Sequence, residues 1–200
     1  MPETLLRYFI LNKPYGTLCQ FTDKEGRPTL GALGRFPADV YPVGRLDADS
    51  EGLVLLSNDG KLKHTLLDPK KRHPRTYLAQ IERLPTPAAI ERLSSGVIIE
   101  GKTTLPAKVR LLDEEPTVPP RPVPIRFRKN VPTAWIEITL HEGRNRQVRK
   151  MTAVVGHPTL RIIRTGIGSL TLEGLRPGEH RALNSTEIAE LRRLVFGTPE

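Results

Sequence analysis

The chain has a single cysteine, Cys19, only 5% aromatic residues and no long apolar run, and each shortage excludes a class of protein. One cysteine excludes an intrachain disulfide, a thiolate zinc site and an iron–sulfur cluster built by this chain alone. No apolar run approaches the ~20 residues that cross a bilayer, and the N-terminus lacks a signal-peptide pattern. We therefore expect a protein of the reducing cytoplasm that is neither secreted nor bound to a membrane.

The histidines are too widely scattered to predict a metal site. They are His64, His73, His141, His157 and His180, and no two have the short spacing that places two ligands on one helix face. We expect no metal and no cofactor. A length of 200 residues is enough to enclose one apolar core, so we predict a single domain over residues 1–200, with room for two lobes.

Positive charge is concentrated in one part of the sequence. Residues 121–164 contain ten Lys and Arg against two Glu, a net charge of +8, whereas the other 156 residues have a net charge of +1. Eight of the ten are arginines, which favours bidentate contacts to phosphate or guanine. This pattern is typical of a surface that meets a polyanion. A solvated polar face is the alternative interpretation.

Short apolar runs separated by turn residues predict an α+β domain with a mixed, mainly antiparallel sheet and a few flanking helices. The predicted strands are residues 8–12, 53–57, 76–81, 97–100, 105–112, 133–140, 160–164, 170–172 and 181–183. Helices are predicted after Asn58-Asp59-Gly60, over 87–93 with Thr86 as its cap, from about Asn145 to Gly156, and over 186–195. Residues 22–40 are expected to be mostly loop, and so is the Pro-rich segment 115–132.

Two segments contain the candidate residues for catalysis and for anion binding. Residues 44–52 place three carboxylates and Arg45 between two glycines, directly before an apolar strand. Loop residues positioned by a rigid strand are a favoured place for catalysis, although a polar turn with capping acids would have the same composition. Residues 141–151 begin the basic helix, where Arg144 and Arg146 lie at the positive end of the helix dipole and call for an anion. Phosphate or a carboxylate such as Asp47 would supply it.

Four segments in this order resemble the RsuA group of RNA pseudouridine synthases. They are residues 12–16 (NKPYG), 44–60 (GRLDADSEGLVLLSNDG), 75–77 (RTY) and 142–151 (EGRNRQVRKM). Residues 20–23, 124–129 and 156–161 are most similar to the RluE branch, which acts on 23S ribosomal RNA. The S4 RNA-binding module of most of the group is expected to be absent, because the catalytic domain's first strand begins at Tyr8.

This resemblance implies a catalytic fold divided around a cleft and a reaction without metal or cofactor. The N1–C1′ bond of a uridine is broken, the uracil turns over, and it is rejoined to the ribose through C5. Asp47 matches the catalytic carboxylate, and Arg149 matches the basic partner that would balance its charge in a pocket. Tyr77 matches the tyrosine that lies against the target base, although an ordinary core tyrosine is the alternative. Whether the carboxylate attacks C1′, attacks C6 or abstracts a ribose proton stays open.

The target nucleotide has to be swung out of stacked RNA, which costs a few kcal/mol that phosphate contacts must offset. Arg45 resembles the residue that fills the vacated space, and Asp49 and Glu51 are assigned to loop structure. The predicted phosphate contacts are Lys13, Arg126, Arg128, Lys129, Arg144 and Arg146. The expected partner is 23S ribosomal RNA, with the protein acting as a monomer.

Two other functions fit parts of the sequence. A non-catalytic rRNA-binding or ribosome-assembly protein would use the same basic stretch, with Asp47 as a structural loop acid. A glycoside hydrolase would pair Asp47 with Asp49 or Glu51, but the low aromatic content argues against a sugar-stacking cleft.

Overall fold

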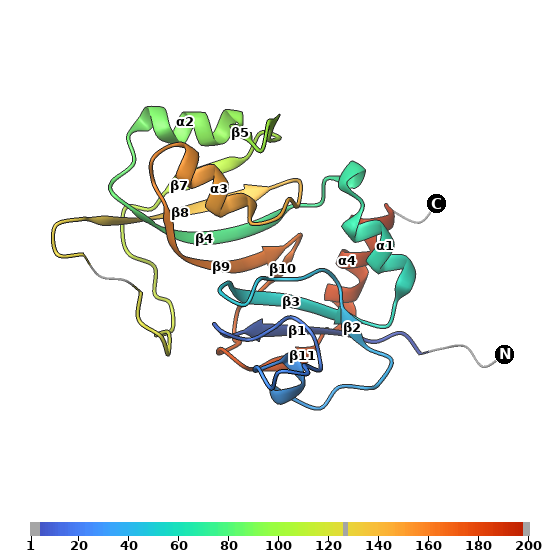
Figure 1. The fold of residues 1–200 in the computed structure, drawn as a ribbon. Helices are drawn as coiled ribbons and strands as arrows, with labels where there is room; N and C mark the ends of the chain where they lie inside the picture. Colours follow the sequence, from blue (N-terminus) through green and yellow to red (C-terminus); the bar gives the residue numbers. More distant parts are fainter. Residues whose placement is uncertain (1–4, 126–127, 198–200) are drawn as a thin grey trace. The chain divides into compact units, whose positions relative to one another are not determined.

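The computed structural model describes residues 5–125 and 128–197, which form two compact units. Unit 1 contains the described residues up to His73 and those from Gly166 onward, and unit 2 runs from Pro74 to Thr165. The elements of both units are shown in Figure 1.

The sheet of unit 1 is built on β1 (Tyr8–Lys13), which pairs antiparallel with β3 (Glu51–Ser57) and with β11 (His180–Ala182). The short strand β2 (Tyr41–Pro42) pairs with the end of β3. The strand β10 (Leu170–Thr171) pairs with the last residues of β9 (Thr159–Ile167), whose preceding part belongs to unit 2.

Both faces of this sheet are covered, which explains why every residue of β3 is buried. Leu53 and Leu55 point to one face, where they join a cluster with α1 (Gly60–Leu67) and α4 (Ser185–Phe196). Val54 and Leu56 point to the opposite face, where side chains of the 19–46 segment cover them. That segment contains only one short helical turn, η1 (Leu30–Ala32), and β2, as its Gly- and Pro-rich composition predicts.

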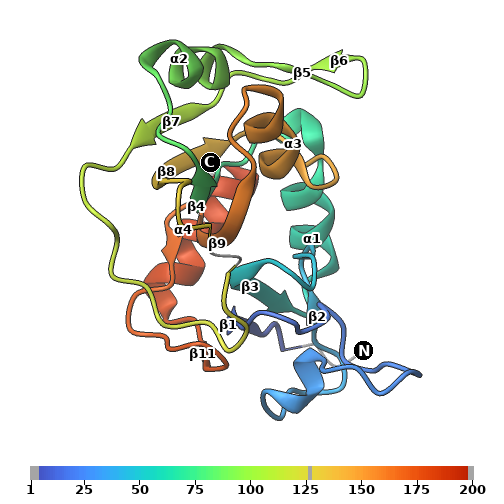
Figure 2. The ribbon, with the colours of Figure 1, turned by 60° about the vertical axis from the view of Figure 1, so that its left-hand side comes forward.

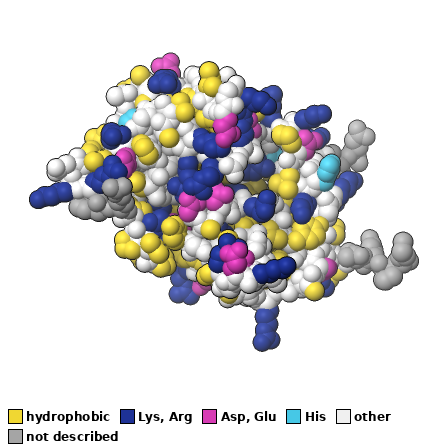
Figure 3. Space-filling view, viewed as in Figure 1, with side chains coloured by type: hydrophobic (Ala, Val, Ile, Leu, Met, Phe, Trp, Pro, Cys, Tyr) yellow, Lys and Arg dark blue, Asp and Glu magenta, His cyan; other side chains and the backbone are white. Residues whose placement is uncertain are grey.

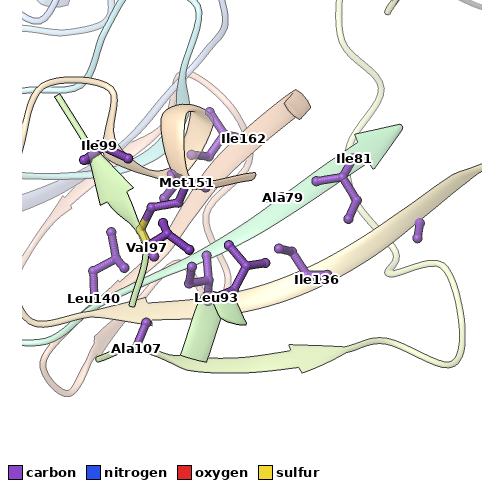
Figure 4. Close-up of a cluster of buried hydrophobic side chains, with 13 residues drawn as sticks. Ala79, Ile81, Leu93, Val97, Ile99, Ala107, Ile136, Leu140, Met151 and Ile162 are labelled. Carbon is purple, nitrogen blue, oxygen red and sulfur yellow. The ribbon is translucent and has the colours of Figure 1, made fainter. Parts of the chain in front are cut away.

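In unit 2, β8 (Thr133–Leu140) pairs antiparallel with β4 (Arg75–Glu82) and with β7 (Lys108–Leu111), and β9 is the neighbour of β4 on the other side. The helix α2 (Pro87–Ser95) packs against β7, and α3 (Gln147–Val154) contacts β5 (Ile98–Ile99), which forms a hairpin with β6 (Lys102–Thr103) (Figure 2). Figure 4 shows the core of this unit, with side chains of both helices directed at the sheet.

The predicted fold class, α+β with a mainly antiparallel sheet, is confirmed. The strand over 133–140 and the Thr86 cap, whose hydroxyl accepts from Ala89 N, are as predicted. Three local predictions were wrong. The run 105–112 forms a strand only from Lys108, the run 97–100 only at Ile98–Ile99, and the basic helix begins at Gln147 and not near Asn145.

Candidate functional site

The loop over 44–52 connects β2 to β3 in unit 1, and the turn that follows β1 is hydrogen-bonded to it. Gly44 has a φ of +81°, the left-handed region that favours glycine. Ser50 N donates to Asp47 O at 3.1 Å, which closes a turn around Asp47, and Gly16 N donates to Ala48 O at 2.8 Å. The side chain of Asp47 is half-buried and that of Arg45 is exposed. The loop therefore presents Asp47 on a backbone that is fixed at both ends.

Lys13 lies beneath this loop and is completely buried. Its ammonium donates to the carbonyl oxygens of Thr17 at 2.8 Å, Pro14 at 3.0 Å and Ala48 at 3.4 Å. Burial lowers the pKa of Lys13 to about 8, although interactions with Cys19 and with the carboxylates of Glu51, Asp49 and Asp47 oppose this shift. We predicted a phosphate contact for Lys13, but the structure places it under the loop, where no surface phosphate reaches it. Its charge instead faces the loop carboxylates.

Tyr77 occupies β4 of unit 2, on the face that also bears Ala79 and Ile81. Its ring is half-buried and packs against the core of that unit, at the end of the apolar row. The ring of Tyr77 therefore contributes to the core of unit 2.

Two arginines that the sequence analysis did not name as site residues lie in this part of unit 2: Arg75 is close to Tyr77, and Arg164 is close to Arg75. Burial lowers the pKa of Arg75, the positive charge of Arg164 lowers it further, and Tyr77 opposes the shift. Arg164 is only 4% exposed. The signal in the sequence was an arginine two residues from Tyr77, hence on the same strand face, and another inside the apolar run of β9.

Arg149 lies on α3, whose core-facing residues Val148 and Met151 are buried as the helical spacing predicts. Its side chain is half-buried, and Nη1 donates to Thr159 O at 3.4 Å. Arg149 therefore lies beside the apolar face of α3 and is only partly exposed.

The residues just before α3 form a hydrogen-bonded scaffold. Glu142 accepts from Leu105 N at 2.9 Å and from Gln147 Nε2 at 2.7 Å, and Arg144 Nε donates to the same carboxylate at 3.0 Å. The remaining nitrogens of Arg144 donate to the carbonyl oxygens of Lys102 and Thr103. The anion that the sequence required at Arg144 is thus supplied by Glu142 of the same loop.

The other predicted phosphate contacts differ in exposure and surroundings. Arg146 is exposed and precedes α3 in a left-handed backbone conformation, with a φ of +51°. Arg128 and Lys129 are exposed and line a groove of about 590 Å³, where Arg128 Nη1 lies 3.3 Å from Glu82 Oε2. Arg126 lies outside the described residues.

Within residues 5–125 and 128–197, the structure contains no group of three or more His, Cys, Asp or Glu side chains arranged to hold a metal ion. No helix in this part of the chain is long and apolar enough to span a bilayer.

Comparison with known proteins identifies the family. The model of the RNA pseudouridylate synthase family matches residues 7–154. The chain belongs to this family. It is 48% identical to the ribosomal large subunit pseudouridine synthase E of Xanthomonas campestris pv. campestris, over 92% of this chain and 98% of that protein. The protein of the same name from Vibrio parahaemolyticus is 49% identical, over 88% of this chain and 74% of its own length.

A solved structure supports the same assignment. The crystal structure of a pseudouridylate synthase superposes with a TM-score of 0.79 and 30% sequence identity, covering 96% of this chain and 76% of that one. The chain is therefore a pseudouridine synthase, and the resemblance drawn from its four segments is confirmed.

Proposed function

We propose that this pseudouridine synthase converts a uridine of 23S ribosomal RNA, in the large subunit, to pseudouridine. The observation that supports this substrate best is the near full-length similarity to two ribosomal large subunit pseudouridine synthases E. The concentrated positive charge over 121–164 supports an RNA ligand independently, because phosphate neutralisation dominates the affinity of such interfaces.

In this proposal Asp47 is the catalytic carboxylate, Arg149 its basic partner and Tyr77 the residue against the target base. Asp47 belongs to unit 1, and the other two belong to unit 2. The anchored turn around Asp47 supports its role, because a reacting group gains most when its backbone is fixed in advance. The half-buried positions of Arg149 and Tyr77 leave part of each side chain accessible.

The proposed reaction is an isomerisation without a net gain or loss of atoms. The N1–C1′ bond breaks, a C1′–C5 bond forms, and the proton at C5 is lost while N1 gains one. Attack at C1′, attack at C6 and abstraction of a ribose proton all require a carboxylate, the role proposed for Asp47. Tyr77 is suited to accept the C5 proton through its hydroxyl.

RNA contact is proposed for the exposed cations Arg45, Arg128, Lys129 and Arg146, and for Arg126 on the grounds of sequence alone.

We also propose that the protein is a cytoplasmic monomer, which light scattering of the purified protein and fractionation of its source cells would test. Asp49 and Glu51 are not needed for chemistry in this scheme and serve loop structure.

The decisive experiment compares Asp47→Asn with Asp49→Asn as the matched control in the same loop. Pseudouridine is mapped in large-subunit RNA after incubation with each protein, using RNA from cells that lack the enzyme. We expect Asp47→Asn to lose at least ~10³-fold in kcat while still binding RNA, and Asp49→Asn to retain conversion. Conversion by Asp47→Asn would refute the mechanism. RNA binding by the wild type without any conversion would favour the non-catalytic rRNA-binding alternative.

A further inference from the structure

A second cationic surface lies in unit 1, outside the basic stretch over 121–164. Residues 60–72, which include α1 and the short turn η2 (Pro69–Lys71), contain five Lys and Arg against one Asp, a net charge of +4. The net charge of the residues outside 121–164 is only +1, because acidic residues elsewhere in the chain offset the charge of this cluster. We call it the α1 surface; its cations are Lys61, Lys63, Lys70, Lys71 and Arg72, with His64 beside them.

The fold turns these cations outward. Leu62 and Leu66 are buried in the core of unit 1, so the opposite side of α1 faces solvent. Lys61, Lys70 and Lys71 are exposed. Figure 3 shows dark blue Lys and Arg side chains over the region where Figure 1 places α1.

The acids that the structure describes do not neutralise these lysines. Within the described part of the chain, none of Lys61, Lys63, Lys70 and Lys71 forms an ion pair with a carboxylate. Asp68, the one acid in the segment, accepts from the backbone N of Lys70 at 2.9 Å and so serves the turn. The ammonium of Lys63 lies 4.5 Å from the centre of the Tyr41 ring, a cation–π contact that orients it without cancelling its charge.

Two of the lysines, Lys63 and Lys70, line a groove that also contains the apolar side chains of Leu67 and Pro69. The groove has a volume of about 580 Å³ and is lined by Gly60, Lys63, His64, Leu67, Asp68, Pro69 and Lys70. Leu67 is 39% exposed there, whereas Leu62 and Leu66 of the same helix are buried. Cations beside the apolar side chains of Leu67 and Pro69 match a nucleic acid strand, which offers phosphates along one side and bases and sugars along the other.

The groove adjoins the loop that bears Asp47. A Cβ built on Gly44 would lie 3.1 Å from Leu67 Cδ2, so the first residue of the 44–52 loop packs against the groove wall. This contact lies within unit 1 and relates the α1 surface to the candidate catalytic loop directly.

We propose that the α1 surface binds the phosphate backbone of the RNA substrate next to the target nucleotide, through Lys63, Lys70 and Lys71. This inference rests on the proposed function for the identity of the RNA. A membrane fits the surface less well, because the apolar side of α1 is occupied by the core and only Leu67 and Pro69 are offered outward.

The test is a triple variant, Lys63→Gln, Lys70→Gln and Lys71→Gln. Its matched control removes three exposed cations elsewhere, Lys24→Gln, Arg35→Gln and Lys108→Gln. Binding of a fluorescently labelled single-stranded RNA transcribed from large-subunit rRNA is measured over a range of salt concentrations. We expect the triple variant to bind roughly tenfold to a hundredfold more weakly at 0.1 M salt, with the slope of log K against log salt reduced by about two units.

The control variant is expected to keep the wild-type slope and the wild-type rate of conversion. Thermal unfolding of both variants checks that they fold, and exposed glutamines should change it little. Equal slopes for the triple variant and the wild type would overturn the inference while leaving the proposed function intact. The inference would also be overturned if the triple variant loses binding to anionic phospholipid vesicles while its affinity for RNA is unchanged. The α1 surface would then bind a membrane. If the wild type binds this RNA but converts no uridine, the proposed function fails, and the salt slope still decides the role of the α1 surface.

Discussion

Lys13 Nζ lies 3.4 Å from the carbonyl oxygen of Ala48, the residue that follows Asp47. A fully buried ammonium thus supports the backbone of the candidate catalytic loop from the inside. Because burial lowers the pKa of Lys13 to about 8, the folded protein releases this proton at a lower pH than the unfolded chain, where the value is the ordinary 10.5. Lys13 therefore contributes a pH dependence to the stability of the fold.

Stability should rise with pH between about 8 and 10.5, relative to a Lys13→Met variant. In that window the unfolded chain binds more protons than the folded chain, so the free energy of unfolding increases with pH. The gain relative to the variant should approach about 3 kcal/mol at the upper end. Urea unfolding of both proteins at a series of pH values measures it. A constant difference between them would show that Lys13 keeps an ordinary pKa.

Asp59 joins the start of α1 to the sheet, and its removal should destabilise unit 1. Its Oδ1 accepts from Leu62 N at 2.9 Å as the helix cap, and its Oδ2 accepts from the hydroxyl of Tyr8 at 2.7 Å. We expect Asp59→Ala to lower the free energy of unfolding by about 2–4 kcal/mol, because it removes a cap and leaves a buried hydroxyl without its acceptor. Asp59→Asn, which keeps a capping oxygen, should lose less. Denaturant unfolding of the two variants provides the comparison.

Arg144→Ala should reduce stability and change RNA binding little. Its guanidinium donates to the part-buried carboxylate of Glu142 and to two exposed carbonyl oxygens of β6, so its loss removes charge-assisted hydrogen bonds, at a cost of about 1–3 kcal/mol. Lys129→Ala is the contrasting variant, because Lys129 is exposed in a groove. It should leave stability nearly constant and reduce the salt slope of RNA binding by about one unit. The opposite pattern in the two variants would mean that Arg144 leaves its protein partners when RNA binds.

Tyr77→Phe separates the ring of Tyr77 from its hydroxyl. The ring packs against the core of unit 2, so the phenylalanine variant should unfold at nearly the wild-type denaturant concentration. If the hydroxyl takes part in removing the C5 proton, kcat should fall by roughly 10²–10⁴-fold with RNA affinity maintained. A wild-type kcat in this variant would assign Tyr77 to packing or base stacking alone. Tyr77→Ala is expected to lose stability as well.

Much of the local structure follows from the sequence because it depends on neighbouring residues. The alternation over 133–140 fixes a strand, and Thr86 followed by Pro87 fixes a helix start, with no need for distant contacts. The strand β2 (Tyr41–Pro42) was not predicted, since two residues give no periodicity and the strand exists through its pairing with β3. Likewise, residues 105–107 read as strand but precede β7, because Leu105 N is bonded to Glu142 and Ala107 N to Ser94 O.

The sequence by itself determined the fold class, the family and the segment that presents Asp47, because these follow from short local patterns of residues. Only the tertiary structure decided which cations are available to a ligand. Lys13, Arg144 and Lys70 are equally basic in the sequence, yet the first is buried under a loop, the second is bound to Glu142 and the third faces solvent. The physical reason is that the charge of a side chain is a property of the residue, whereas its burial and its partners depend on segments far away in the chain.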